Sequence, residues 1–195
     1  MFKNKFHLNT TTVGIGGCRL NDTSNCSYEF QLFIFKCQLK LAAELKLPVV
    51  FHNCGINSFE ITLRELKLHL NNTHKIHWHC INSKSDLNII SNFLNYFKNS
   101  LIGLNGSMTT PYDNDSKRIF NNWLLTQQDI LDRIRIEADF PFLRPSTLET
   151  NQYNPISGIT TGAQHIVNML RIKKLNATKI IDRSNNNMRR MYGIN

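Results

Sequence analysis

Short apolar runs alternate along the chain with longer segments in which apolar residues recur every three or four positions. The short runs, rich in Val and Ile, lie at residues 12–15, 48–52, 75–79, 100–104 and 134–139. Apolar runs of this length that end in a polar residue are typical of buried β-strands. We therefore predict five strands.

The segments between these runs have the periodicity of amphipathic helices. In the first of them, Tyr28, Phe35 and Leu39 fall on one helical face. The predicted helices span about 27–45, start near 58 and 85, include 119–123, and close the chain at about 162–170 and 176–192. Strands separated by such helices form right-handed βαβ units and an α/β fold with a parallel sheet. The pattern fits an open doubly wound sheet or an incomplete (β/α)8 barrel, because a full barrel takes ~250 residues.

Length and composition limit the class of protein. With 195 residues the chain is long enough for one domain, and 41% apolar residues with twelve Phe exclude a disordered protein. No apolar run approaches the ~18 residues of a membrane-spanning helix, and the N-terminal MFKNKFHLNT lacks the apolar segment of a secretory signal. We therefore expect no membrane partner and an intracellular location, in the nucleus or the cytoplasm.

The cysteines fit a reducing compartment. The five cysteines are Cys18, Cys26, Cys37, Cys54 and Cys80. An odd number without a signal peptide argues against a disulfide framework, and the absence of a C-x-x-C pair argues against a ribbon-type zinc site. We interpret all five as buried structural thiols.

The formal charge of +9 is compatible with a polyanionic partner. Nucleic acid is the first candidate, since a basic protein binds phosphate backbones. However, the Lys and Arg residues are scattered, which is equally typical of a solvated basic surface. Charge alone therefore leaves both interpretations open.

Polar residues at the predicted strand ends are the candidates for chemistry. His52, His79, Asn105 and Asp139 each end or follow an apolar run, and parallel folds gather such residues at one face. Two imidazoles and a carboxylate suit a borderline metal such as Zn²⁺ or Mn²⁺. The alternative is that they are unrelated polar residues at separate strand ends.

Five short segments carry a family resemblance. In chain order they are LPVVFH (47–52), HC (79–80), EADFPFL (137–143), NP (154–155) and NMRRMYG (187–193). In this order and at these spacings they resemble the TatD family of metal-dependent deoxyribonucleases, amidohydrolase-like TIM barrels. The resemblance covers about residues 12–195, as the C-terminal part of a TatD-like hydrolase domain, whereas residues 1–11 do not match. The segment KIHWHC (75–80) is most similar to the branch that includes the animal nuclear TatD-domain proteins.

The resemblance implies a fold, an activity and a site. It implies a partial TIM barrel with about five of the eight βα units, and a hydrolase that cleaves DNA phosphodiester bonds. His52, His79 and Asp139 match metal ligands of the family, and Asp139 also matches the acceptor of a proton from the attacking water. The implied cofactor is a divalent ion, Mg²⁺, Mn²⁺ or Zn²⁺, and the implied partner is DNA, single-stranded or at duplex ends.

Two departures from the family pattern lower the expected activity. The opening units with a His-x-His pair are missing, so we expect an N-terminally truncated domain. In the strand that reads GEIGLD in the family, Gly17 replaces the glutamate that bridges two metals, and Asn21 replaces the aspartate. We therefore expect at most one ion and negligible nuclease activity. The alternative function is a catalytically inactive remnant or pseudoenzyme with at most weak nucleic-acid binding.

Several neighbouring residues need a separate interpretation. His77 shares a strand face with His79, and Cys54 follows His52 by two residues, so each is a minor candidate for metal contact. Trp78 is expected to pack outward against a helix. Missing strands leave open sheet edges and uncover inward-facing side chains, which we expect to be Val50, Ile76 and Ile136. We therefore predict self-association through the sheet edges.

Overall fold

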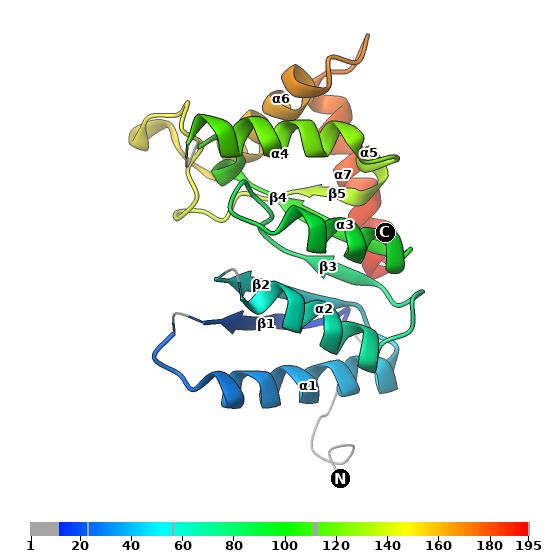
Figure 1. Ribbon diagram of the computed structural model, residues 1–195. Helices are drawn as coiled ribbons and strands as arrows, with labels where there is room; N and C mark the ends of the chain where they lie inside the picture. The colour runs from blue at the N-terminus through cyan, green and yellow to red at the C-terminus, as the bar shows by residue number, and fades with distance from the viewer. Residues whose placement is uncertain (1–11, 23, 56, 111–112, 195) are drawn as a thin grey trace.

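The computed structural model describes residues 12–22, 24–55, 57–110 and 113–194, so the predicted non-matching segment 1–11 lies outside it. Its centre is one parallel sheet with the strand order β1-β2-β3-β4-β5 (Figure 1). The strands are β1 (Ile15–Asn21), β2 (Val49–Cys54), β3 (Ile76–Trp78), β4 (Ser100–Leu104) and β5 (Ile134–Ile136). The five predicted strands and their parallel arrangement are confirmed.

The first strand lies later in the chain than predicted. The pattern placed it at residues 12–15, whereas β1 starts at Ile15 and ends at Asn21. It is an edge strand with exposed Gly16, Gly17 and Arg19, so only Cys18 and Leu20 are apolar and buried. A strand with so few buried positions has little apolar signal.

Helices follow the strands in the predicted alternation. They are α1 (Tyr28–Leu45), α2 (Ser58–His69), α3 (Leu87–Tyr96), α4 (Asn114–Thr126), α5 (Ile130–Arg133), α6 (Pro155–Leu170) and α7 (Ala177–Tyr192), with 3₁₀ turns η1 (Gly106–Thr109) and η2 (Thr150–Gln152). Helix α6 begins at Pro155, earlier than its apolar periodicity indicated, because the Asn154 side chain caps it. None of the helices in the described residues is long and apolar enough to span a membrane.

Aromatic side chains join the sheet to the helices. Trp78 of β3 is fully buried and stacks on Phe59 of α2, with ring centroids 5.4 Å apart. It also meets the ring of Phe93 in α3 edge-on at 5.1 Å. The prediction that Trp78 packs outward against a helix is therefore confirmed. Aromatic pairs of this geometry hold α2 and α3 on the sheet.

The opposite, inner face of the sheet is more polar than predicted. Side chains alternate along a strand, so Ile76 lies on the helix-covered face with Trp78. Ile136 also faces the helices, since it packs beside Gly162 of α6. The expectation that both point into the barrel is wrong, because the residue after each of them, His77 and Glu137, takes that place. Val50 keeps its predicted inward position.

Helix α7 covers the open edge of β5 (Figure 1). The hydroxyl of Ser184 accepts a hydrogen bond from the backbone N–H of Ile136 at 2.9 Å. One turn further, the Asn187 amide donates to the carbonyl of Ile134 at 2.8 Å. Both side chains are buried and replace the partners that a neighbouring strand would offer.

At the other edge, the side chain of Gln31 in α1 pairs with the backbone of Asn21. It accepts the Asn21 N–H at 2.9 Å and donates to the Asn21 carbonyl at 3.1 Å. Gly16, Gly17 and Arg19 of β1 are exposed, and self-association through the sheet edges stays a prediction.

We expect the double variant Ser184→Ala/Asn187→Leu to lose about 2–4 kcal/mol of folding free energy, since each buried unsatisfied group costs about 1–3 kcal/mol. It also reopens the β5 edge, so the variant should form more oligomer than the parent. Chemical denaturation and size-exclusion chromatography with light scattering measure both effects. Asn185→Ala, on the exposed side of α7, is the matched control. Unchanged stability and unchanged size would contradict the capping role.

Candidate metal centre

The polar strand ends meet at one edge of the sheet. His52 lies in β2, His79 follows β3, Asn105 follows β4, and Asp139 comes shortly after β5. The imidazole centroids of His52 and His79 are 5.6 Å apart, and His79 Nε2 lies 3.1 Å from Asp139 Oδ1. The Asn105 amide donates to Asp139 Oδ2 at 2.8 Å. The structure thus brings the four predicted residues together, while their roles as ligands stay predictions.

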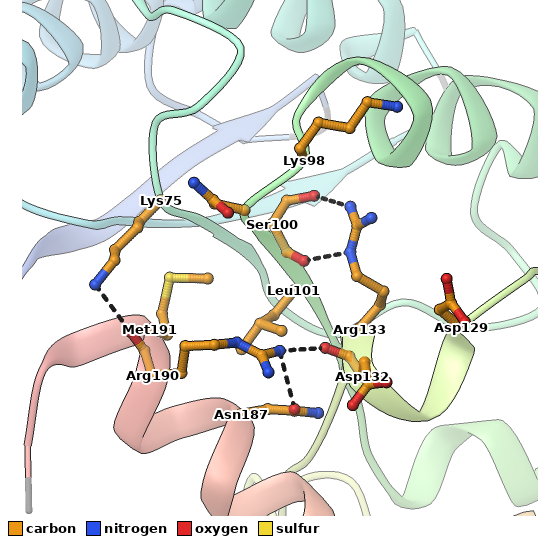
Figure 2. Close-up of a pocket in the computed structure, with 11 residues that line it drawn as sticks. Lys75, Lys98, Ser100, Leu101, Asp129, Asp132, Arg133, Asn187, Arg190 and Met191 are labelled. Atoms are coloured by element: carbon orange, nitrogen blue, oxygen red, sulfur yellow. Dashed lines mark hydrogen bonds between the residues drawn. The ribbon is translucent and has the colours of Figure 1, made fainter.

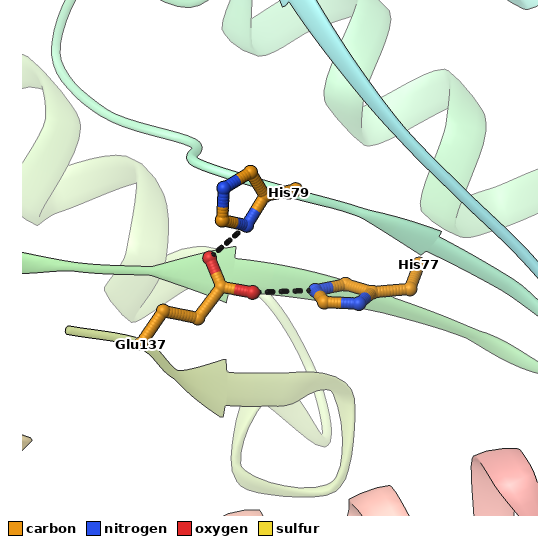
Figure 3. Close-up of side chains that lie close together, drawn as sticks. All are labelled: His77, His79 and Glu137. Atoms are coloured by element: carbon orange, nitrogen blue, oxygen red, sulfur yellow. Dashed lines mark ion pairs between the residues drawn. The ribbon is translucent and has the colours of Figure 1, made fainter. Parts of the chain in front are cut away.

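Glu137, which the sequence reasoning left without a role, is at the centre of this edge. Its Oε2 lies 2.6 Å from His79 Nδ1 and its Oε1 lies 2.8 Å from His77 Nε2 (Figure 3). Burial opposes ionisation, but hydrogen bonds from His77 and His79 outweigh it and lower the pKa of Glu137 well below its usual range. The signal in the sequence was its position two residues before Asp139, where an extended chain places both side chains on one face.

His77, His79 and Glu137 are the one group of three metal-capable side chains in the described residues whose ligand atoms all lie within 4.8 Å of one another. His52 and Asp139 do not belong to this group. The contacts of 2.6 and 2.8 Å are ion pairs between an imidazole and a carboxylate. Glu137 therefore accepts the Nδ1 proton of His79 and leaves Nε2 to face Asp139. Ligating histidines in proteins are commonly fixed in this way by a carboxylate on the other ring nitrogen.

The contact between His79 and Asp139 fits a divalent ion. Burial disfavours the charged imidazole, but hydrogen bonds with Asp139 and Glu137 raise the pKa of His79 to about 10. In the metal-free protein a proton therefore lies between Nε2 of His79 and the carboxylate of Asp139. Two ligand atoms each ~2.1 Å from one ion lie ~3 Å apart when they are neighbours. The observed 3.1 Å permits such an ion and is also the length of an ordinary ion pair between an imidazole and a carboxylate.

His52 has the protonation state that a metal ligand needs. Burial lowers its pKa, and the nearby charges of His79 and Arg19 lower it further. The ring is therefore neutral near pH 7. Its Nδ1 is buried without a hydrogen-bond partner, and its Nε2 lies 3.1 Å from Cys54 Sγ.

His77 is buried, and each of its ring nitrogens lies close to a polar atom. It is fully buried, Nε2 contacts Glu137, and Nδ1 lies 3.1 Å from the hydroxyl of Tyr192. Tyr192 is in α7, so this contact joins the end of the last helix to the centre. These contacts hold Glu137 in place and give His77 a positioning role.

The edge strand β1 places no carboxylate beside this centre. A Cβ atom added to Gly17 would have no heavy atom within 4 Å, and the register between β1 and β2 is irregular between Ile15 and Cys18. Arg19 pairs with His52 in the strand register, and its Nη2 lies 3.2 Å from Cys54 Sγ. The position that matches a bridging glutamate is therefore an exposed glycine of the edge strand, with no side chain to offer a ligand.

Comparison with known proteins shows which family this chain belongs to. A family model described as TatD related DNase matches residues 4–193. The chain belongs to this family. A search of curated proteins found no match. Placement in a particular branch of the TatD family stays a prediction.

Solved structures share the TatD fold. The TatD homologue YjjV from Escherichia coli K12 matches with a TM-score of 0.68 and 20% identity, over 94% of this chain and 64% of that one. A TatD family hydrolase from Entamoeba histolytica matches with a TM-score of 0.70 and 19% identity, over 92% and 63%. At these identities the likeness shows the fold alone: five parallel strands with flanking helices, arranged as in part of a TIM-like barrel.

A third match is more distant. The phosphotriesterase homology protein from Escherichia coli, solved with phosphate in its active site, has a TM-score of 0.59 and 14% identity, over 90% of this chain and 58% of that one. The chain thus spans less than two thirds of the length of each of these three structures.

A cavity of about 430 Å³ lies at the amino ends of β3 and β4, away from the TatD-type centre (Figure 2). Its basic side chains bind backbone carbonyls: Arg133 Nε donates to Ser100 at 2.7 Å and Lys75 Nζ to Arg190 at 2.8 Å. Arg190 in turn donates to the carbonyl of Asp132 at 2.7 Å. These cations stabilise the ends of α3, α5 and α7, so we assign this cavity no part in catalysis.

Proposed function

We propose that this chain is a metal-dependent hydrolase of DNA phosphodiester bonds that works with one divalent ion held by His52, His79 and Asp139. The observation that carries the proposal is the arrangement of His79, which Glu137 holds at Nδ1 while Nε2 faces Asp139. TatD family membership supports the reaction class.

We assign a separate chemical role to each part of the centre. A divalent ion bound there lowers the pKa of water and offsets negative charge on the scissile phosphate. Asn105 donates to Oδ2 of Asp139, whereas Oδ1 lies 3.1 Å from His79 Nε2 and is the oxygen that would hold the ion and accept a proton from the attacking water. The chain's charge of +9 provides salt-dependent attraction for the DNA backbone.

The open space at Gly17 limits the expected rate. Without a carboxylate there, a second ion ~4 Å from the first has little negative charge to offset the repulsion. We therefore propose one ion and slow turnover. The same observation favours the second candidate, a nucleic-acid-binding protein without turnover.

Digestion of labelled single-stranded DNA with Mg²⁺, Mn²⁺ or Zn²⁺ tests the proposal. We expect slow, metal-dependent cleavage that Asp139→Asn lowers at least 100-fold, since losing a ligand and proton acceptor removes several kcal/mol of transition-state stabilisation. Asp129→Asn, in the cavity at the other end of the sheet, is the matched control. Salt-dependent DNA binding without any cleavage would instead support the second candidate.

A further inference from the structure

Three loops at the carboxyl end of the sheet line a cavity of about 660 Å³, a volume in the range of small-ligand pockets. Its walls are residues 82–84 after β3 and residues 142–144 after β5, together with Ser107 of η1 after β4. Each of these loops also carries one residue of the candidate centre, namely His79, Asn105 or Asp139. The cavity therefore opens beside the candidate metal centre.

A neighbouring cavity joins this one to the centre. It has a volume of about 650 Å³, reaches His52, and shares residues 82–84 and Leu143 with the first cavity. The two cavities adjoin along these shared residues and form one groove. A ligand that extends along the groove can therefore lie both at the centre and against residues 142–144.

The groove has the charge that a phosphate backbone requires. Lys84 and Arg144 are exposed on the walls of the first cavity, and none of the described residues that line this cavity is acidic. Arg144 donates to the carbonyl of Leu148, which leaves most of its five N–H donors for an anion. By contrast, the cavity at the amino ends of β3 and β4 contains two carboxylates, Asp129 and Asp132.

Phe142 adds an aromatic surface to this wall. It is 85% exposed, the largest value among the large apolar residues that the structure describes. Its backbone N–H donates to the carbonyl of Asp139 at 2.8 Å, so a turn presents the ring close to the centre. Single exposed apolar residues are common on proteins, but Phe142 lies in a cationic groove. Cations and an exposed aromatic ring together are typical of grooves that bind single-stranded nucleic acid.

We propose that the groove is a nucleotide subsite, in which a base stacks on Phe142 while Arg144 and Lys84 hold the adjacent phosphate. This rests on the proposed function and extends it to the choice of substrate. The bases of a duplex are stacked on one another, so their faces are not free to cover a side chain. The subsite therefore selects single-stranded DNA over duplex ends.

The loops of the subsite are fixed to one another before any ligand binds. The N–H of Ser146 donates to Thr109 Oγ1 at 2.9 Å, and its hydroxyl donates to the carbonyl of Thr109 at 2.8 Å. Gly106 lies so close to the loop after β5 that an added Cβ would overlap the carbonyl oxygen of Leu143. A site that is already ordered spends less free energy on ordering when it binds.

Fluorescence anisotropy of a labelled oligothymidylate with the full chain in EDTA tests the subsite without any metal chemistry. We expect Phe142→Ala to weaken binding about 5- to 100-fold, the usual effect of losing one stacked base. Phe142→Trp should keep the affinity, because it keeps an aromatic face. Phe33→Ala, which removes an exposed ring of α1, is the matched control and should bind as the parent does.

An oligonucleotide of equal length with abasic positions separates stacking from charge. The parent should bind it more weakly than oligothymidylate, whereas Phe142→Ala should bind the two alike. Arg144→Gln should weaken both complexes and lower the slope of log affinity against log salt by about one. Arg189→Gln, which removes an exposed arginine of α7, should leave that slope unchanged.

Three results would overturn the subsite: a Phe142→Ala variant that binds both oligonucleotides as the parent does, a parent that binds blunt duplex as tightly as single strand, or a parent that binds no single strand. Cleavage with added metal is measured separately on the same proteins. Metal-dependent cleavage without the Phe142 effect would leave the proposed function intact. Binding that depends on Phe142 without cleavage would support the subsite and contradict the hydrolase.

Discussion

Gly17→Glu is expected to raise metal-dependent DNA cleavage by at least tenfold and to let the chain bind a second ion. The resemblance to the TatD family implies a carboxylate that bridges two metals at this position, and no heavy atom lies within 4 Å of a Cβ built there. A carboxylate between two cations offsets their repulsion, and a second ion adds stabilisation of the developing charge. Cleavage of labelled DNA and the stoichiometry of Zn²⁺ or Mn²⁺ binding by calorimetry measure the two effects.

The fold is expected to accept this substitution without loss of stability. A Cβ atom at Gly17 meets nothing within 4 Å, and its backbone is outside the left-handed region that favours glycine. The neighbouring Gly16 is different, because a Cβ there would lie 2.8 Å from the backbone and side chain of Val50. Gly17→Gln is the matched control, of equal size without charge. If Gly17→Glu behaves as Gly17→Gln does, the open space at β1 is not a missing ligand position.

The strand-end residues could be predicted because parallel strands collect their carboxyl ends at one edge. His52, His79, Asn105 and Asp139 needed only the approximate strand positions. The strands that present them lie near the predicted places, although β2 continues to Cys54 and β5 ends at Ile136. Their contacts follow from that topology. By contrast, β1 was misplaced because its two glycines and exposed Arg19 give an edge strand almost no apolar pattern.

Contacts between distant parts of the chain were beyond the sequence pattern. Tyr192 is 115 residues from His77, and only the packing of α7 brings its hydroxyl to the imidazole. Ser184 and Asn187 fall within an Asn-rich helix, where nothing in the pattern separates an edge cap from a solvated side chain. The contact of Cys54 with both His52 and Arg19 depends in the same way on the register between β1 and β2.

We expect the largest loss of folding free energy from a substitution of the buried carboxylate of Glu137. Glu137→Gln keeps the size of the side chain but leaves one acceptor oxygen for two imidazoles, so the amide N–H₂ must face His77 or His79. Removing one partner of a buried ion pair costs about 3–5 kcal/mol, which chemical denaturation of the metal-free protein measures.

The same substitution should weaken metal binding by about 10- to 100-fold, because His79 is no longer held with Nε2 toward Asp139. Glu65→Gln is the matched control, because the Glu65 side chain is as buried as that of Glu137, at 3% exposed. Glu65 lies in helix α2, and its carboxylate is 3.5 Å from Lys36. It should lower stability and leave metal affinity unchanged. If Glu137→Gln and Glu65→Gln bind Zn²⁺ equally well in calorimetry, Glu137 is a structural residue alone and His79 takes its orientation from elsewhere.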